Sequence, residues 1–457
     1  MTAAPDLRSI AEIAPLLRTG VLSPVDLVRG CLESISRYAR LHAFITVMAD
    51  DALARAHQAH AEIAAGRYIG PLHGVPVSVK DLVDIAGTPT TSGSRVPPLH
   101  PRTDAPIVAR LRSAGAILVG KTNLHEFAFG TTSDETAFGA VRHALDESRS
   151  AGGSSAGAAV ALATGMCFGA VGTDTGGSIR IPSAVCGTVG LKPTLGELPG
   201  DGVVPLSTTL DHVGPMARSV TDVALLYSAM RGDVTATFPA AAALPVTLGV
   251  PEPYFCDKLN PDVRRAMQRV RDSLVRGGHV VRPVSIEHAA WTPDVYLHIV
   301  LPEASWYHAP MLVSHAGAYS PGVRLRLEMG RYVLAEDYVR ALRLRDHLTQ
   351  RVDDVLAGCD ALLLPAQPAT APPLGATSIE LDGAKEPVRA AMLRLTQLFN
   401  LTGHPAIAIP AGRGDDGLPI GMQLVGRRHE TEALLGIAAS LESQITEGPG
   451  SVGGGTG

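Results

Sequence analysis

The chain has 457 residues, 46% of them hydrophobic, and a formal net charge of -5 at pH 7. A chain of this size can bury a core large enough to fold without disulfide bonds or metal ions. Its 39 Lys and Arg residues stand against 44 Asp and Glu residues. Because this leaves no basic surplus for phosphate groups, we expect no nucleic acid partner.

Two further features of the composition concern location and cofactors. No basic segment followed by an apolar run opens the sequence, and no stretch reaches the roughly 18 apolar residues of a membrane span. The five cysteines are scattered, without a Cys-x-x-Cys pair or a nearby His in metal-ligand spacing. We therefore expect a cytoplasmic protein with reduced, mostly buried thiols and no contact with a membrane.

Helical and strand patterns alternate along the chain, which is typical of an α/β fold. Residues 1–40 predict a helical pair, whose second helix begins at Ser23-Pro24. Short apolar runs predict buried strands at 75–79 and 116–119, and a helix near 107–112 separates them.

The second half of the chain continues this alternation, except in one segment. Residues 303–330 have the most irregular pattern, and we expect the region 300–330 to shape a substrate pocket. No repeat or linker is evident, so we expect one domain over 1–447 and a disordered Gly-rich tail over 448–457. The other predicted elements are strands at 246–250, near 280, at 361–364 and at 406–409, and helices from Asn260-Pro261 to Gly277 and over 334–356.

One short motif suggests nucleotide binding. Gly115, Gly120, Lys121 and Thr122 fit the phosphate-loop pattern, in which two glycines bracket four residues before Lys-Thr. A phosphate loop has to be a flexible turn between a strand and a helix, but the four bracketed residues here are apolar and predict the strand itself. We therefore interpret the segment as an interior strand followed by a turn.

A second motif has the components of a hydrolase. From residue 151 to 215 the sequence is rich in Gly, Ser, Thr and Ala, and within it the run Thr175-Gly176-Gly177-Ser178 can direct successive backbone N–H groups at one point. Such a cradle stabilises an oxyanion, and Ser178 at its end is a candidate nucleophile. A serine needs a base, and no His lies within these motifs.

Lys80 is the candidate base. It follows the predicted strand 75–79, and side chains at strand ends commonly point into a site. Burial among apolar and hydroxyl groups lowers a lysine pKa by up to several units from about 10.4, so that the neutral amine can accept a proton. Region 70–215 is thus the predicted catalytic core.

The sequence resembles the amidase signature family. The resemblance rests on the two Gly- and Ser-rich motifs and extends over nearly the full chain. The matching runs are Gly74-Val75-Pro76-Val77-Ser78-Val79-Lys80-Asp81, Asn123-Leu124-His125-Glu126-Phe127, Gly152-Gly153-Ser154-Ser155-Ala156-Gly157, Gly172-Thr173-Asp174-Thr175-Gly176-Gly177-Ser178-Ile179-Arg180-Ile181-Pro182, Gly190-Leu191-Lys192-Pro193-Thr194, Leu210-Asp211-His212-Val213-Gly214-Pro215, Asn400-Leu401-Thr402-Gly403-His404-Pro405-Ala406 and Gly417-Leu418-Pro419-Ile420-Gly421-Met422-Gln423-Leu424-Val425-Gly426.

This resemblance implies a fold and a mechanism. The implied fold is a single-domain α/β/α sandwich around a large mixed β-sheet. The implied triad is Lys80 as base, Ser154 as proton bridge and Ser178 as nucleophile, with a cis peptide bond before Ser154. The resemblance also implies an acyl-enzyme on Ser178 and a reaction that needs neither a metal nor an organic cofactor.

The resemblance also assigns supporting roles. An oxyanion hole is implied at Thr175, Gly176, Gly177 and Ser178. Substrate contacts are implied at Phe129, Gly130 and Ser154, and structural support of the catalytic loop at Asp174, Arg180 and Ser155.

Departures from the family pattern bear on the substrate. The glutamine-hydrolysing components of transfer-RNA amidotransferases usually have Gln where this chain has Ile181, and Arg where it has Glu197. An apolar residue beside the site favours a less polar substrate. We therefore expect a stand-alone amidase of small aliphatic or aryl amides, anilides or carbamates. The alternative is the glutamine-hydrolysing component of an amidotransferase complex. A homodimer remains open, since family members are frequently dimers.

Overall fold

The computed structural model describes residues 6–236 and 242–446. The strands in these residues form a sheet of eleven strands and a separate pair. They are β1 (Phe44–Val47), β2 (Pro76–Lys80), β3 (Ile117–Thr122), β4 (Gly169–Asp174), β5 (Val189–Lys192), β6 (His212–Ala217), β7 (Thr247–Pro251), β8 (Val280–Val284), β9 (Ala361–Pro365), β10 (Ser378–Leu381), β11 (Ala384–Pro387), β12 (Ala406–Arg413) and β13 (Pro419–Val425).

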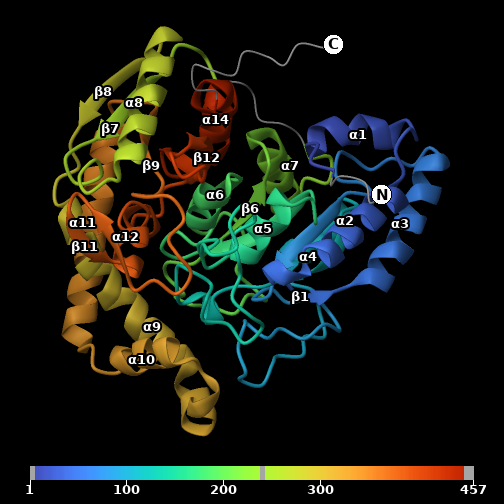
Figure 1. The fold of residues 1–457 in the computed structure, drawn as a ribbon, viewed down its shortest axis with the longest axis horizontal. Coiled ribbons are helices and arrows are strands. Elements are labelled where there is room, and N and C mark those ends of the chain that lie inside the picture. The colour runs from blue at the N-terminus through green and yellow to red at the C-terminus, as the bar shows by residue number, and fades with distance from the viewer. Residues whose placement is uncertain (1–5, 237–241, 447–457) are drawn as a thin grey trace.

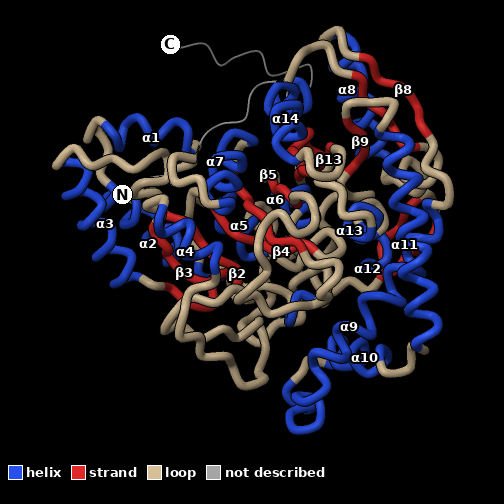
Figure 2. The backbone as a smooth tube through the Cα atoms, turned by 180° about the vertical axis from the view of Figure 1, so that it is seen from behind, coloured by secondary structure: helices blue, strands red, loops and turns tan. Residues whose placement is uncertain are grey.

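The eleven-stranded sheet is mixed. Its strand order is β1-β3-β2-β4-β6-β5-β12-β13-β9-β7-β8, and β10 pairs with β11 alone. Strand β2 runs parallel to both β3 and β4, whereas β12 runs antiparallel to β5 and β13. The sheet passes through the middle of the molecule with helices on both sides (Figures 1 and 2). The predicted α/β/α sandwich around a large mixed sheet is confirmed.

Helices form two layers around this sheet. In one layer α5 and α6 contact each other and the central strands, and in the other α7, α8 and α14 pack together and against the sheet. The helices are α1 (Ile10–Arg18), α2 (Pro24–Arg37), α3 (Ala49–Ala64), α4 (Pro106–Ser113), α5 (Ala156–Ala163), α6 (Arg180–Cys186), α7 (Val220–Arg231), α8 (Pro261–Arg276), α9 (Thr292–His315), α10 (Pro321–Gly330), α11 (Ala335–Leu356), α12 (Val388–Leu393), α13 (Gln397–Leu401) and α14 (Thr431–Thr446), with short 3₁₀ turns η1 (Ala39–Leu41), η2 (Glu126–Ala128), η3 (Ala289–Trp291) and η4 (Ala316–Ala318).

Local signals account for many element boundaries. Ser9 and Glu12 form a capping box at the start of α1. Asn260 caps α8, and Pro261 occupies its first turn. The predicted strands at 75–79 and 116–119 correspond to β2 and β3, each shifted by one to three residues.

The prediction of an irregular segment over 303–330 is wrong. Helix α9 continues to His315, and α10 occupies Pro321–Gly330. Two prolines lie inside α9, Pro302 and Pro310, and they interrupt the helical signal without ending the helix. Helix α10 packs along α9, so tertiary contacts outweigh the local breaking signals. Both helices extend away from the sheet (Figure 1).

The phosphate-loop motif is not a loop. Gly120, Lys121 and Thr122 belong to β3, which is buried throughout. The ammonium group of Lys121 lies 2.6 Å from Asp81 Oδ1, and both side chains are fully buried. Because the lysine is committed to this ion pair, it is not available to a phosphate group. The interpretation as an interior strand is confirmed.

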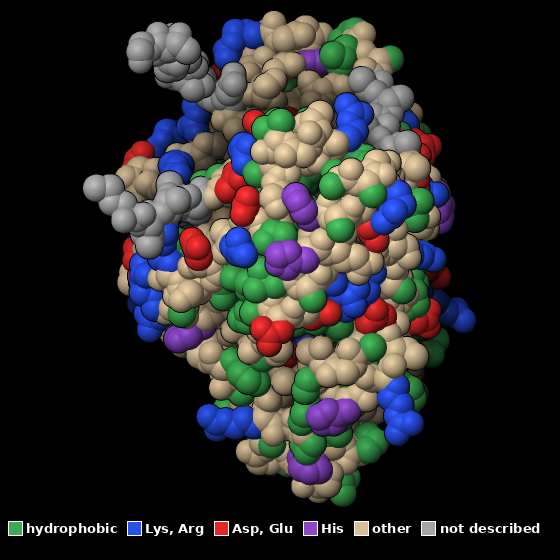
Figure 3. Space-filling model, turned by 90° about the vertical axis from the view of Figure 1, so that its right-hand side faces the viewer, with side chains coloured by type: hydrophobic (Ala, Val, Ile, Leu, Met, Phe, Trp, Pro, Cys, Tyr) green, Lys and Arg blue, Asp and Glu red, His purple; other side chains and the backbone are tan. Residues whose placement is uncertain are grey.

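Three further predictions concern the cysteines, membrane contact and surface charge. The cysteines are free thiols, four of them buried. No helix in residues 6–236 and 242–446 has the length and apolar character needed to cross a membrane. On the face in Figure 3, basic and acidic side chains are interspersed rather than gathered by sign. The predicted tail, 448–457, lies outside the described residues.

Candidate active site

Lys80 lies at the end of β2 with no exposed surface. Strand β2 runs parallel to β4, where Val79 pairs with Val171, and this register brings Thr173 beside the lysine. Lys80 Nζ is 2.7 Å from Ser154 Oγ and 2.8 Å from Thr173 Oγ1. Burial lowers the pKa of Lys80 to about 7, although the charges of Asp174 and Asp211 oppose this effect. A large fraction of Lys80 is therefore neutral near neutral pH.

Ser154 follows a cis peptide bond from Gly153 and is fully buried. Its carbonyl oxygen accepts hydrogen bonds from the backbone N–H of His125, at 3.2 Å, and from Ser133 Oγ, at 3.4 Å. A Cβ atom on Gly153 would lie 2.8 Å from the Thr131 carbonyl carbon, so only glycine fits there. These contacts fix the position of the Ser154 hydroxyl group beside Lys80.

Ser178 lies on the neighbouring loop, between β4 and α6, and retains 5% of its surface. The backbone N–H of Ser155 donates to the Ser178 carbonyl oxygen at 3.1 Å, which joins the two serine loops. The Ser155 hydroxyl group donates to the Thr173 carbonyl oxygen at 3.2 Å. In the described part of the chain, the Ser178 hydroxyl group has no hydrogen-bond partner, so it is free to meet a substrate.

The backbone of 175–178 has open donors. No N–H group of Thr175, Gly176, Gly177 or Ser178 donates to an acceptor among residues 6–236 and 242–446. Buried donors of this kind need a partner. Gly177 has φ of +139°, a conformation that other residues rarely adopt. This geometry suits a bound oxyanion.

A buried ion pair between Asp174 and Arg180 holds the loop 175–178 in place. The Arg180 guanidinium group donates to both carboxylate oxygens of Asp174 at 3.0 Å, and to the Asn400 side-chain oxygen at 2.7 Å. Asn400 also donates to Asp174. Arg180 and these hydrogen bonds hold the pKa of Asp174 well below its usual value, despite full burial. The pair is therefore ionised and fixes where the loop turns into α6.

Sequence reasoning missed two further supports of the loop. The Thr175 hydroxyl group donates to Asp211 at 2.5 Å, and the Thr396 hydroxyl group donates to the Gly176 carbonyl oxygen at 2.5 Å. Burial raises the pKa of Asp211 to about 6. Asp211 stands within a quoted motif and Thr396 does not, and only the fold shows what the two residues contact.

The Phe129 side chain is 1% exposed and faces two cations. The guanidinium carbons of Arg326 and Arg389 lie 5.3 and 5.8 Å from the centre of its ring. Next in sequence, Gly130 packs so closely on His125 that a Cβ atom there would lie 2.1 Å from the imidazole ring. His125 Nε2 in turn lies 3.2 Å from Glu135 Oε2, and this contact helps to lower the pKa of Glu135 to about 2.

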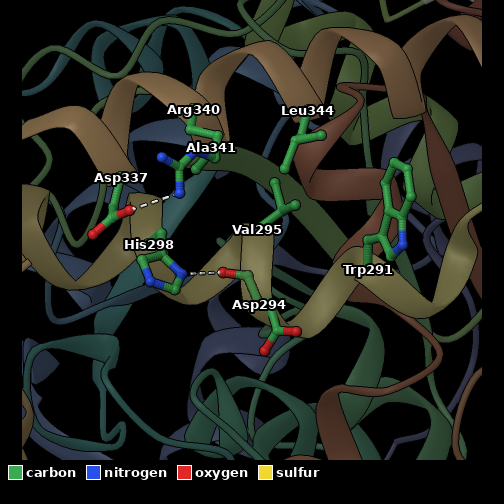
Figure 4. A pocket seen from close by; sticks show the side chains of 8 residues that line it. All are labelled: Trp291, Asp294, Val295, His298, Asp337, Arg340, Ala341 and Leu344. Atoms are coloured by element: carbon green, nitrogen blue, oxygen red, sulfur yellow. Dashed lines mark hydrogen bonds and ion pairs between the residues drawn. The ribbon is translucent and has the colours of Figure 1, made fainter.

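A separate pocket of about 300 Å³ lies between α9 and α11 (Figure 4). None of Lys80, Ser154 and Ser178 lines it. Its Arg340 is already paired with Asp337 at 3.1 Å. The pocket is therefore distinct from the triad, and its lining residues are Trp291, Asp294, Val295, His298, Asp337, Arg340, Ala341 and Leu344.

The two departures from the amidotransferase pattern lie in packed surroundings. Ile181 is fully buried, and its side chain lies 2.8 Å from the position of a Cβ atom on Gly177. Glu197 accepts hydrogen bonds from Tyr227 at 2.7 Å and Thr431 at 2.6 Å. Both residues therefore stabilise the fold. For this reason they are not evidence for a less polar substrate.

Comparisons with known proteins show the family of the chain. The Amidase family model matches residues 26–435. An amidase from Pseudomonas putida is 38% identical, with 96% of each chain covered. The glutamyl-tRNA(Gln) amidotransferase A chain from Desulfotalea psychrophila is 33% identical, with 97% of this chain and 98% of that protein covered.

Solved structures give the same result. A crystal structure of an amidase superimposes with a TM-score of 0.92 at 38% identity and covers 96% of this chain and all of that one. The native peptide amidase from Stenotrophomonas maltophilia superimposes with a TM-score of 0.81 at 28% identity, over 96% of this chain and 98% of that one. The chain therefore belongs to the amidase family, whose enzymes hydrolyse amide C–N bonds.

Proposed function

We propose that the chain is a stand-alone amidase of small carboxamides that acts through Lys80, Ser154 and Ser178. The observation that carries this proposal is the 2.7 Å contact between Lys80 Nζ and Ser154 Oγ in a fully buried environment. A neutral amine beside a serine hydroxyl group is a competent base.

The first half of the reaction forms an acyl-enzyme. Ser178 Oγ attacks the amide carbon, its proton passes to Ser154 Oγ, and the proton of Ser154 passes to Lys80 Nζ. The negative charge on the carbonyl oxygen is stabilised by the open N–H groups of residues 175–178. The C–N bond then breaks, and the relay run in reverse gives the departing nitrogen its proton.

Water completes the cycle. It attacks the ester on Ser178 while the same relay removes its proton, and the acid product leaves with Ser178 regenerated. No hydrogen bond joins the hydroxyl groups of Ser154 and Ser178 in the described structure. Catalytic contacts of this kind often tighten only when substrate binds.

The substrate class is the second part of the proposal. Aliphatic amides, aryl amides, anilides and carbamates share this tetrahedral chemistry. The 38% identity to an amidase supports a single-chain enzyme. The 33% identity to an amidotransferase component makes glutamine hydrolysis within a complex the second candidate function.

The test is ammonia or amine release by the purified single chain from amides, anilides, carbamates and glutamine. Ser178→Ala and Lys80→Ala are the inactive variants, and exposed Ser314→Ala is the matched control. We expect turnover by the wild type and the control, and loss of nearly all turnover in the other two. Activity on glutamine that appears only with added partner proteins would replace this proposal with the second candidate.

A further inference from the structure

Arg389 is a cation without a counterion beside the catalytic loops. It belongs to α12, and its Nε atom is buried without a hydrogen-bond partner. Across residues 6–236 and 242–446 it forms no ion pair and no hydrogen bond. Burial lowers the pKa of Arg389, and the like charge of Arg326 adds to this effect. An arginine remains charged all the same, so this side chain calls for an anion.

The acids near Arg389 are already in use. Glu386, three residues earlier, lies 2.5 Å from Lys258 Nζ. Glu135 pairs with Arg326 at 3.1 Å. Because each carboxylate has another cation as its partner, the protein itself supplies no anion for Arg389.

Two contacts place this arginine at the reaction site. Its guanidinium carbon lies 5.8 Å from the centre of the Phe129 ring. One turn later on α12, Leu393 packs on the loop of the proposed oxyanion hole, 3.0 Å from the position of a Cβ atom on Gly176. The cation therefore lies beside the Phe129 ring, on a short helix that packs on the loop that carries Ser178.

A second open polar group stands next to the same loop. The Tyr296 hydroxyl oxygen lies 2.7 Å from the position of a Cβ atom on Gly176, and the residue is 2% exposed. This hydroxyl group has no hydrogen-bond partner in the described part of the chain. Tyr296 is near enough to Arg389 to raise the pKa of the guanidinium group, against the larger effect of burial. A hydroxyl group and a guanidinium group together match the two oxygens of a carboxylate.

Space for a ligand adjoins this arginine. Arg389 lines a pocket of about 240 Å³ together with apolar residues such as Leu297 and Leu393 and the charged residues Lys258, Glu386 and Arg394. Leu393 itself packs on Gly176, so the pocket adjoins the loop of the proposed oxyanion hole. A short hydrocarbon chain packs against the apolar residues of the pocket, and a charged end reaches the guanidinium group.

We propose that Arg389, assisted by the Tyr296 hydroxyl group, selects amide substrates that carry a carboxylate group a few bonds from the reacting amide. This inference rests on the proposed amidase function and adds the substrate class. Arg389 is a specificity residue, which binds the remote group and takes no part in proton transfer.

The experiment compares matched amide pairs that differ only in this charge. The pairs are succinamate with 4-methylpentanamide, glutaramate with 5-methylhexanamide, and 4-carboxyacetanilide with 4-isopropylacetanilide. Wild type, Arg389→Met and Tyr296→Phe are assayed, with Arg276→Met as the control. Arg276 is an exposed arginine at the end of α8, and it does not line this pocket.

We expect the wild type to favour at least one carboxylate member about tenfold or more in kcat/KM, from the usual strength of a charge-assisted hydrogen bond. Arg389→Met brings the ratio within that pair close to one, chiefly by raising KM of the anionic amide. Tyr296→Phe reduces the ratio less, and Arg276→Met leaves it as in wild type. A wild-type ratio near or below one in every pair, or a ratio that survives Arg389→Met, overturns the inference.

A binding measurement tests the carboxylate site without relying on turnover. It therefore separates this inference from the proposed function. Calorimetry follows succinamate and succinate binding to Ser178→Ala and to Ser178→Ala/Arg389→Met. If the wild type hydrolyses neutral amides without any charge preference, only the carboxylate site fails. If no amide is hydrolysed but succinate binding requires Arg389, the site stands and the amidase proposal fails. Binding that is absent, or indifferent to Arg389, refutes the site.

Discussion

The buried state of Lys80 predicts how the stability of the protein depends on pH. The folded pKa of Lys80 is about 7 against 10.5 for a solvated lysine, because its ammonium group loses hydration. A difference of about 3.5 pH units corresponds to about 5 kcal/mol at roughly 1.4 kcal/mol per pH unit. Between pH 7 and 10.5 the unfolded chain thus binds a proton at Lys80 that the folded chain has lost.

The sign follows from linkage. Since the unfolded state binds more protons, the free energy of unfolding rises with pH in this window. Lys80→Met removes the titrating group and keeps the volume. We expect the unfolding free energy of wild type, relative to Lys80→Met, to increase by about 2–3 kcal/mol from pH 6.5 to 9.

Urea unfolding of both proteins at several pH values measures this difference, and effects common to both proteins cancel. If the difference between the two is independent of pH, or falls as pH rises, then Lys80 is not an amine with a lowered pKa. The reasoning about the base is then refuted.

The remaining predictions use other parts of the site. The kcat/KM of amide hydrolysis rises about tenfold from pH 6 to 8, as the base with a pKa of about 7 loses its proton, and a flat pH profile contradicts this. Asp174→Asn leaves the buried Arg180 cation without its counterion, so we expect the free energy of unfolding to fall by about 3–5 kcal/mol. Urea unfolding measures this loss, and a loss below about 1 kcal/mol contradicts a buried ion pair. Gly130→Ala forces the His125 ring aside and lowers the thermal midpoint, whereas Gly30→Ala, which meets no atom within 4 Å, does not.

Much of the sheet could be predicted from the sequence. Runs such as Val75 to Val79 are apolar, short and bounded by turn residues, so they predict a buried strand without tertiary information. The same reasoning separated strand β3 from a phosphate loop, because apolar side chains filled the positions of a flexible turn. Lys80 followed from its place at a strand end.

Other features depend on contacts between distant segments. Helix α9 contains two prolines that signal a break, and only its packing against α10 shows that the helix persists. Arg389 belongs to no recognisable motif. Nothing in the sequence around it shows that its guanidinium group lies beside the Phe129 ring. The roles of Ile181 and Glu197 were misjudged because a residue next to a catalytic motif in sequence can face the core.

The most direct test of the proposed mechanism is to trap the acyl-enzyme. An activated ester of a substrate acid is mixed with the enzyme, the reaction is quenched in acid within milliseconds to seconds, and the modified peptide is located by mass spectrometry. We predict that the acyl group is on Ser178, that Ser178→Ala carries none, and that Lys80→Met accumulates it far more slowly. An acyl group on Ser154 or Ser155, or wild-type turnover by Ser178→Ala, would contradict the assignment of Ser178 as nucleophile.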